Sequence, residues 1–403
     1  MLNLFARSTT LTESRRLPGL DTLRATAITW VLLFHAEIFD LIPEGHRLIE
    51  AGWMGVDLFF ALSGYLIGGQ LFRPMARGEQ VSYHTFFLRR ALRTLPAYLA
   101  VVSIYFLFPG IREGVDIQPL WQFLAFTENM FVTVETPKAF SHVWSLCVEE
   151  QFYVLLPLAV LGLSKRPTAS KVGIAALSIL VFGMAIRAWA WLSGVSSTPF
   201  DIAAEPNGDN YIHLIYYPTW SRLDGLLAGV MVAAAQTFRS AQWRRFERHA
   251  NGAVVLGLLG VAASMATFRY QVAGLWAAIF GYPLIAASMA ALVAGASVPT
   301  SALGRLKIPG VGALAAGSYS LYLSHKLVYK AVKMGWIPTF YAGPHAKLAT
   351  ALVVAAIVGV ALHRSVERPF LTLRNRWTGS RRQHGLPDKT VEADGERAFQ
   401  HSA

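Results

Sequence analysis

Ten apolar stretches, each close to 20 residues long, recur along the chain and are separated by short polar segments. About 20 apolar residues is the length that an α-helix needs to cross roughly 30 Å of hydrocarbon. The pattern therefore predicts an all-α, polytopic integral membrane protein with about ten transmembrane helices. The predicted spans are 22–42, 52–72, 95–111, 144–164, 172–194, 214–237, 251–268, 273–297, 313–335 and 348–364. The apolar run from Pro119 to Phe131 is too short to cross, so we predict an interfacial or re-entrant segment there.

The composition supports this picture. Of the 403 residues, 54% are hydrophobic and 15% are charged, whereas soluble chains average roughly 25% charged residues. An ordinary soluble enzyme, a disulfide scaffold and a disordered chain are thereby excluded. The single cysteine, Cys147, cannot form an intrachain disulfide, and its apolar setting gives no reason to predict a metal site.

The net charge of +12 reflects topology rather than nucleic-acid binding. When the C-terminal tail is counted from Arg364 onward, 25 Lys and Arg residues of the termini and loops fall on the side of the two termini and 5 fall on the other side. Positive loops stay on the cytoplasmic side of a membrane. We therefore predict a multi-pass protein of the inner (cytoplasmic) membrane with both termini in the cytoplasm, and no nucleic-acid partner.

Ionisable residues inside the predicted spans carry the functional signal, because a charge at bilayer depth is costly. Arg24 and His35 lie eleven residues apart in the first span, close to three helical turns. Both then fall on one face, about 16 Å apart along the helix axis, with His35 deep in the membrane. For this pair alone, a snorkelling arginine and a core histidine are as good an explanation as a site.

Other spans contain buried polar groups of the same kind. The second span holds Asp57, a carboxylate that needs a partner. In the fourth span, His142, Ser145 and Glu149 form a polar stripe, and Glu150 points to another face. The remaining groups are Arg90 and Arg93 ahead of the third span, Arg222 and Asp224 in the sixth, and Tyr319, Tyr322 and His325 in the ninth. So many buried charges predict a polar cavity between helices.

These residues stand in blocks that resemble the membrane acyltransferase family 3. The blocks follow the family's order: Arg24-x10-His35, Gly-Val-Asp-Leu-Phe-Phe-x-Leu-Ser-Gly over 55–64, Arg90-x-x-Arg93, Trp-Ser-Leu-x-Val-Glu-Glu-Gln-Phe-Tyr over 144–153, Arg222-x-Asp224-Gly225, Ser-Tyr-Ser-Leu-Tyr-Leu-x-His over 318–325, and Glu367-Arg-Pro369. The chain departs from the family at Cys147, where Ser is frequent, and over 324–326, which read Ser-His-Lys where an aromatic-rich run is usual.

The resemblance implies ten or eleven helices that move an acyl group, commonly acetyl from acetyl-CoA, onto a hydroxyl of a glycan or other acceptor. We accordingly divide the chain into a cytoplasmic segment 1–18, a membrane acyltransferase domain 19–371 and a flexible cytoplasmic tail 372–403. No stretch between spans is long enough for the extra esterase-like domain of larger members. The expected partners are acyl-CoA as donor substrate, a glycan, lipid-linked glycan or other hydroxyl acceptor, and membrane lipids. No permanently bound cofactor is expected.

We assign catalytic roles to His35, Glu149 and Asp57. His35 would either deprotonate the acceptor hydroxyl or carry the acyl group itself, and Asp57 or Glu149 would fix its tautomer. Donor binding falls to Arg24, Arg90 and Arg93, since arginines bind phosphates in a bidentate manner. The supporting residues are Ser63, Ser145, Glu150, Arg222, Asp224, Tyr319, His325 and Glu367.

Three other interpretations account for part of this pattern. A proton-coupled transporter also needs buried histidines and carboxylates, but it would move substrate without CoA. A membrane scaffold needs none of these charges. His35 and Asp40 match the acid/base motif of glycerolipid acyltransferases, although residues five apart on a helix point about 140° apart.

A last pattern lies at the end of the ninth span. Lys326, Lys330 and Lys333 follow i, i+4, i+7 spacing and are expected on one helix face. They would either anchor the helix in the outer interface or form a docking strip for an anionic acceptor.

Overall fold

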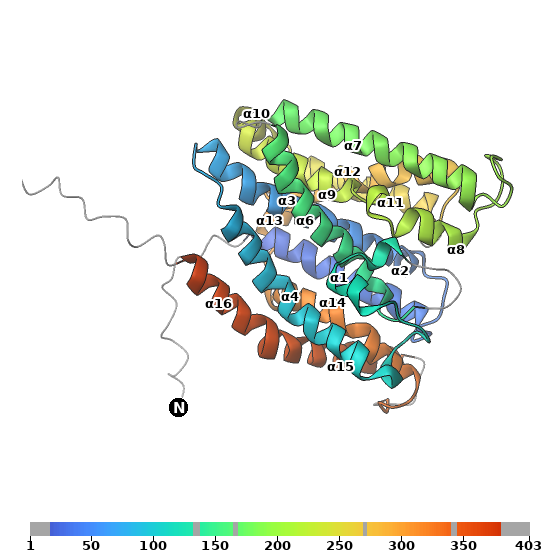
Figure 1. Ribbon diagram of the computed structural model, residues 1–403. Helices are drawn as coiled ribbons and strands as arrows, with labels where there is room; N and C mark the ends of the chain where they lie inside the picture. The colour runs from blue at the N-terminus through green and yellow to red at the C-terminus, as the bar shows by residue number, and fades with distance from the viewer. Residues whose placement is uncertain (1–16, 132–137, 164–167, 269–271, 340–344, 380–403) are drawn as a thin grey trace, which may run out of the picture.

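The computed structural model describes residues 17–131, 138–163, 168–268, 272–339 and 345–379 (Figure 1). Within these ranges the regular elements are all helical, and the β-structure is limited to two isolated β-bridges. The α-helices are α1 (Pro18–Ile38), α2 (Arg47–Glu50), α3 (Met54–Ala76), α4 (Tyr83–Leu107), α5 (Leu120–Leu124), α6 (Trp144–Leu163), α7 (Ala169–Ala190), α8 (Gly208–Tyr211), α9 (Asp224–Phe238), α10 (Ser240–Glu247), α11 (Ala250–Thr267), α12 (Leu275–Ala296), α13 (Ala302–Arg305), α14 (Val311–Lys333), α15 (Ala346–Leu362) and α16 (Arg368–Gly379). The all-α prediction is confirmed.

Short helical segments of other types join these helices. The 3-10 segments are η1 (Ala51–Trp53), η2 (Pro109–Ile111), η3 (Glu128–Met130), η4 (Ser141–Val143) and η7 (Thr219–Ser221). The π segments are η5 (Trp191–Val195), η6 (Ile212–Tyr216) and η8 (His363–Glu367). The apolar run 119–131 forms only the short α5 and η3, as its length predicted.

Seven helical stretches of the described chain are long and apolar enough to cross a membrane: Arg47–Ala76, Tyr83–Leu107, Ser141–Gly162, Ser170–Val195, Ala250–Thr267, Leu275–Ala296 and Ala346–Thr378. Asp224–Phe238 is apolar but shorter. Helices α1 and α14 are 21 and 23 residues long, and they are less apolar because they carry many of the polar groups discussed below. The protein is a multi-pass membrane protein, and the count of ten spans stays a prediction.

Three element boundaries differ from the expected ones. Helix α4 begins twelve residues earlier than the predicted span 95–111, at Tyr83, where the Ser82 hydroxyl caps it by accepting from the Thr85 amide at 3.3 Å. Arg90 and Arg93 therefore lie on a helix and not in a loop. The predicted span 214–237 is broken at Pro218, whose ring cannot continue a helix, and α9 starts only at Asp224.

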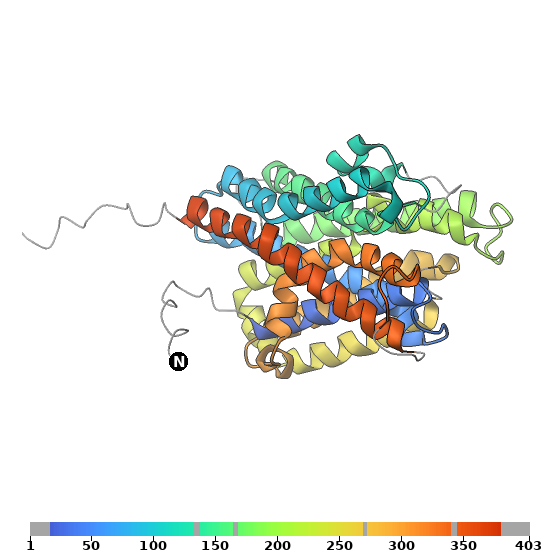
Figure 2. The same ribbon diagram turned by 90° about the horizontal axis from the view of Figure 1, so that it is seen from below.

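The third difference concerns the C-terminal end. Helix α15 continues through η8 into α16, and Figure 2 shows them as one long rod across the face of the molecule. The first residues of the predicted tail, 372–379, are thus helical. Residues 380–403, and 1–16 of the predicted N-terminal segment, lie outside the described residues.

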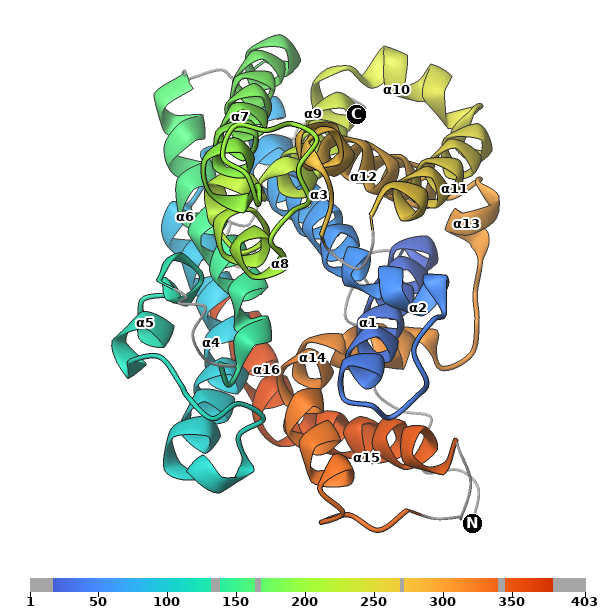
Figure 3. The same cartoon turned by 90° about the vertical axis from the view of Figure 1, so that its right-hand side faces the viewer.

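Helices α1 and α3 lie at the centre of the bundle, with α6 and α7 on one side and α11 and α12 on the other (Figure 3). Helix α3 packs most extensively against α9, and α1 packs against α14 and α3. The α3–α9 contact depends on glycines: a Cβ atom at Gly64 would lie 2.0 Å from the Leu226 carbonyl oxygen. One at Gly229 would lie 2.1 Å from the Ala61 carbonyl oxygen. Small residues let the backbones approach, as is typical of membrane helices.

Candidate active site

Two histidines from helices far apart in the sequence meet at the centre of the bundle. His35, on the last turn of α1, and His325, on α14, are 8% and 0% exposed. The Nδ1 of His35 and the Nε2 of His325 lie 3.0 Å apart. The Nδ1 of His325 lies 2.7 Å from the Tyr322 carbonyl oxygen and 3.3 Å from that of Leu321. The two rings thus form a chain that ends on backbone carbonyls.

This chain assigns the tautomers of both rings. A carbonyl oxygen only accepts hydrogen bonds, so the Nδ1 of His325 carries a hydrogen and donates it. In neutral His325 the Nε2 then has a lone pair and accepts from the Nδ1–H of His35. The Nε2 of His35 is left with its own lone pair, which is the form that a general base requires.

A small cavity adjoins His35. Its volume is about 160 Å³. Its polar lining includes His142, whose side chain is 2% exposed and whose ring nitrogens make no hydrogen bond of normal geometry within the described chain. The ring centroid of His142 lies 6.2 Å from that of His35 and 5.0 Å from that of His325. The remaining lining residues are Val31, Phe34, Ile38, Trp53, Val56, Ser141, Trp144, Tyr216, Tyr217, Tyr322 and Lys326.

Lys326 points into this buried region, and the predicted strip of three lysines is wrong. Lys326 is 7% exposed, and its Nζ donates to the Ser141 Oγ at 2.9 Å. Lys330 is half-buried, and Lys333 is exposed, where it pairs with Asp40 at 2.5 Å. The helix sinks into the bundle toward its middle, so the exposure of the three side chains rises from Lys326 through Lys330 to Lys333. The pairing of Asp40 with Lys333 also keeps Asp40 from serving His35.

Neither predicted carboxylate contacts His35, so the expectation that one of them fixes its tautomer is wrong. The tautomer is held by His325 instead. Glu149, on α6, accepts hydrogen bonds from Ser63 Oγ at 3.1 Å and from Tyr153 Oη at 2.7 Å. Asp57 is bound to Arg222, with 2.9 Å between carboxylate and guanidinium.

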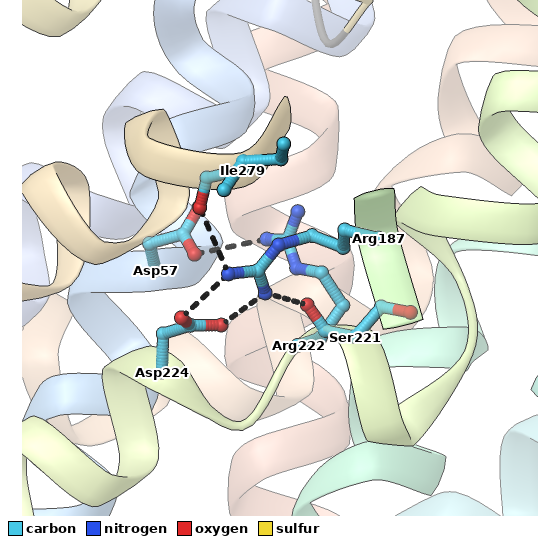
Figure 4. A network of polar contacts seen from close by, with 6 residues as sticks. All are labelled: Asp57, Arg187, Ser221, Arg222, Asp224 and Ile279. Carbon is cyan, nitrogen blue, oxygen red and sulfur yellow. Dashed lines mark hydrogen bonds and ion pairs between the residues drawn. The ribbon is translucent and has the colours of Figure 1, made fainter. Parts of the chain in front are cut away.

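Figure 4 shows the network around Asp57. Arg222 is 1% exposed, and its guanidinium stacks 4.4 Å from the ring centre of Tyr282. Next to it, the fully buried Arg187 of α7 makes a two-pronged contact with Asp224, at 2.8 and 3.1 Å, and also donates to the Ser221 carbonyl at 2.7 Å. Two buried ion pairs thus tie α3, α7 and the start of α9 together, which favours a structural role for Arg222 and Asp224.

The predicted donor-binding arginines gather at the other end of α1. Arg24 pairs loosely with Asp21 at 3.7 Å and lies within electrostatic range of Arg90 and Arg93. Arg90 stacks on Tyr153, with 4.8 Å from its Cζ to the ring centre. Since Tyr153 also donates to Glu149, that carboxylate adjoins the arginine cluster rather than His35.

The other supporting residues lie between these regions or beside them. Ser145 Oγ and Tyr322 Oη are 2.7 Å apart, and Tyr322 donates to the His142 carbonyl at 2.9 Å, next to the cavity. Tyr319 donates to the Thr94 carbonyl on α4 at 3.0 Å. Glu367 accepts from Ser320 and His363 at 2.7 and 2.8 Å and thereby holds η8 against α14.

Outside the spans, Glu128 of η3 is fully buried near the same cavity. Neither of its carboxyl oxygens has a hydrogen-bond partner in the described chain. Burial raises the pKa of Glu128 to about 8, against the opposing effect of the Lys326 ammonium. Glu128 is therefore mostly protonated at neutral pH.

With this geometry in hand, comparison with known proteins gives the family. A family model described as an acyltransferase domain matches residues 17–364. The chain belongs to this acyltransferase family. The match covers all of the residues above except Glu367 and its neighbours.

Curated relatives of this chain include larger proteins. The O-acetyltransferase OatA of Staphylococcus aureus is 25% identical in an alignment of 388 positions that covers 91% of this chain and 59% of that protein. The peptidoglycan O-acetyltransferase OatA of Listeria monocytogenes is 28% identical in an alignment of 245 positions that covers 58% of this chain and 36% of that protein. The chain thus spans well under two thirds of the length of these relatives. No solved structure matches it.

Sequence reasoning gave no adequate role to three residues of this chain. Arg187 was a lone charge inside a predicted span, and the cost of such charges could have flagged it. His142 was noticed only as part of a stripe. Arg374, on α16, comes within electrostatic range of Arg90 and Arg93, and no pattern in the sequence connects it with them.

Proposed function

We propose that this acyltransferase moves an acyl group, acetyl in the first place, from acyl-CoA to a hydroxyl of a glycan at the membrane. The family and the O-acetyltransferases among its relatives support the reaction class. The observation that carries the proposal is the chain from His35 through His325 to the Tyr322 carbonyl, which leaves one basic nitrogen beside a cavity.

His35 is the general base of this reaction. Its Nε2 takes the proton of the acceptor hydroxyl while the oxygen attacks the thioester carbonyl, forming a C–O bond. As the tetrahedral intermediate collapses, the C–S bond breaks and the thiolate of CoA receives the proton from Nε2. The positive charge that His35 carries in between strengthens its hydrogen bond to His325, because a charged donor binds more strongly.

The donor binds from the end of α1 that carries Arg24. Arg24, Arg90 and Arg93 bind the phosphates of the donor. Glu149 orients Arg90 indirectly, because it accepts a hydrogen bond from Tyr153, on whose ring Arg90 stacks. The pantetheine arm then runs along α1 toward His35, an axial separation of about 16 Å. With both termini in the cytoplasm of an inner-membrane protein, this arginine cluster faces the compartment that contains CoA.

The experiment is acetyl transfer by the purified full chain in nanodiscs, with radiolabelled acetyl-CoA and soluble glycan acceptors. His35→Ala should abolish transfer, whereas His249→Ala, at an exposed histidine, should retain it. Transfer by His35→Ala above a few per cent of wild type would overturn the mechanism. Substrate uptake into sealed vesicles without CoA would favour the transporter instead.

A further inference from the structure

We propose that the cavity beside His35 is an acceptor subsite for a carboxylated sugar, with Lys326 as the cation that binds the carboxylate. The inference deepens the proposed function, because it names the class of acceptor. It starts from a cation in an unusual place: a lysine 7% exposed, on the wall of a cavity that also contains the reacting histidine.

Lys326 keeps hydrogen-bonding capacity to spare. Its one hydrogen bond goes to the Ser141 hydroxyl, at 2.9 Å, so two of its three N–H groups remain available. No carboxylate of the described chain forms an ion pair with it. A buried ammonium without a counter-ion is costly, and a ligand that brings a negative charge offsets that cost.

The surrounding charges favour a carboxylate over a phosphate. The buried Glu128, mostly protonated at neutral pH, leaves the charge of Lys326 largely uncancelled. Glu113 is also within electrostatic range of Lys326, and its Oε1 accepts from the Phe140 amide at 2.8 Å. A single ammonium offsets one negative charge, so a singly charged ligand leaves no net charge on the pair, whereas a doubly charged ligand leaves an uncompensated buried charge.

The size of the cavity fits this assignment. Pockets that enclose whole drug-sized ligands measure roughly 300–1,000 Å³, whereas this one measures about 160 Å³. It can hold the reacting end of an acceptor and not a complete oligosaccharide. The aromatic side chains of Trp53, Trp144, Tyr216 and Tyr217 line its walls.

The test compares two acceptors with the same hydroxyl groups, methyl β-D-glucuronide and its neutral amide, methyl β-D-glucuronamide. Wild type should use the glucuronide with a kcat/KM about tenfold or more above that for the glucuronamide, as one charge-assisted contact provides. In Lys326→Met the ratio should fall to about one. Lys330→Met, one turn further along α14 and half-buried, is the matched control and should keep the wild-type ratio.

Binding is measured separately by saturation-transfer NMR on the donor-free full chain in nanodiscs. The glucuronide should bind wild type and lose binding in Lys326→Met, or in Lys326→Gln if the first variant does not fold. An unchanged ratio, an equal loss on both acceptors or undiminished glucuronide binding would each overturn the subsite. Absence of transfer to both acceptors, with glucuronide binding intact, would instead count against the proposed function alone.

Discussion

The hydrogen bond to His325 leaves His35 with one ring nitrogen, Nε2, that can accept a proton. Its Nδ1 is engaged by His325, a residue 290 positions away, and His325 is itself fixed by the Tyr322 carbonyl. In this arrangement a second imidazole does the orienting that a carboxylate does in many other sites. The chemistry at His35 therefore depends on a residue that touches no substrate.

The first prediction concerns this positioning role. His325→Gln retains an oxygen that can accept from His35, and His325→Leu does not. We expect the Leu variant to lose about a hundredfold or more in kcat, the usual contribution of a general base, with little change in the KM for acetyl-CoA. The Gln variant should recover part of the loss. Equal activity of the two variants, at equal melting temperatures, would assign His325 to packing.

The second prediction separates two adjacent carboxylates. Glu149 receives two hydroxyl donors and adjoins Arg90 and Arg93, whereas Glu150 faces Thr94. Glu149→Gln keeps the shape but removes the charge that orients the arginines, so it should raise the KM for acetyl-CoA about tenfold, the effect of one charged contact. Glu150→Gln should change it less. Steady-state kinetics with varied donor decides this, and equal sensitivity would refute the assignment.

At the scale of elements, the contact between α3 and α9 is set by backbone approach. Gly64 and Gly229 face carbonyl oxygens of the opposite helix with no room for a methyl group. The apolar side chains around these glycines would tolerate exchange within a well-packed core. The glycines therefore fix how close the two helices can lie.

The third prediction tests this contact. Gly64→Ala should destabilise the protein by about 1–3 kcal/mol, the usual effect of overpacking. Gly252→Ala, in α11, meets no atom within 4 Å and should stabilise by about 0.5–1 kcal/mol, because alanine favours a helix. Unfolding in mixed detergent micelles measures both changes. A Gly64→Ala protein as stable as wild type would show that the helices can move apart.

Helical periodicity predicted the faces of the elements but not their partners. It placed Arg24 and His35 on one face of α1, and it gave α6 and α11 nearly to the residue. It could not bring His325 to His35, because nothing local relates two residues 290 positions apart. Periodicity also predicted that Lys326, Lys330 and Lys333 lie together at the surface. Their spacing indicates a common helix face, but it does not indicate how deeply each part of the helix is buried.

At the scale of the whole molecule, the segments predicted to face opposite sides of the membrane lie at opposite ends of the bundle. Helix α10, from a loop predicted to be cytoplasmic, is at one end, and α2 and α8, from loops predicted to be outside, are at the other (Figure 1). The positive-inside pattern then decides which end is which. Because the two sets of loops lie at opposite ends, labelling one residue in each set can determine the topology.

The fourth prediction fixes the sides. The only cysteine, Cys147, is fully buried, so introduced cysteines can be labelled selectively. With a membrane-impermeant maleimide on intact cells, Ser197→Cys, in the exposed loop before α8, should react. Ser240→Cys, exposed at the start of α10, should react only after the membrane is permeabilised. The reverse pattern would invert the topology and place the arginine cluster away from cytoplasmic CoA.

The paired charges of Figure 4 also constrain how the chain is made. Asp57 is synthesised 165 residues before Arg222, and Arg187 is synthesised 37 residues before Asp224. Until the later partner emerges from the ribosome, α3 contains an uncompensated acid and α7 an uncompensated base, and neither is stable alone in lipid. Releasing these helices into the bilayer one by one would leave each unpaired charge at a cost of a few kcal/mol. If α3 and α7 stay beside the insertion machinery until Arg222 and Asp224 emerge, the charges enter the bilayer already paired.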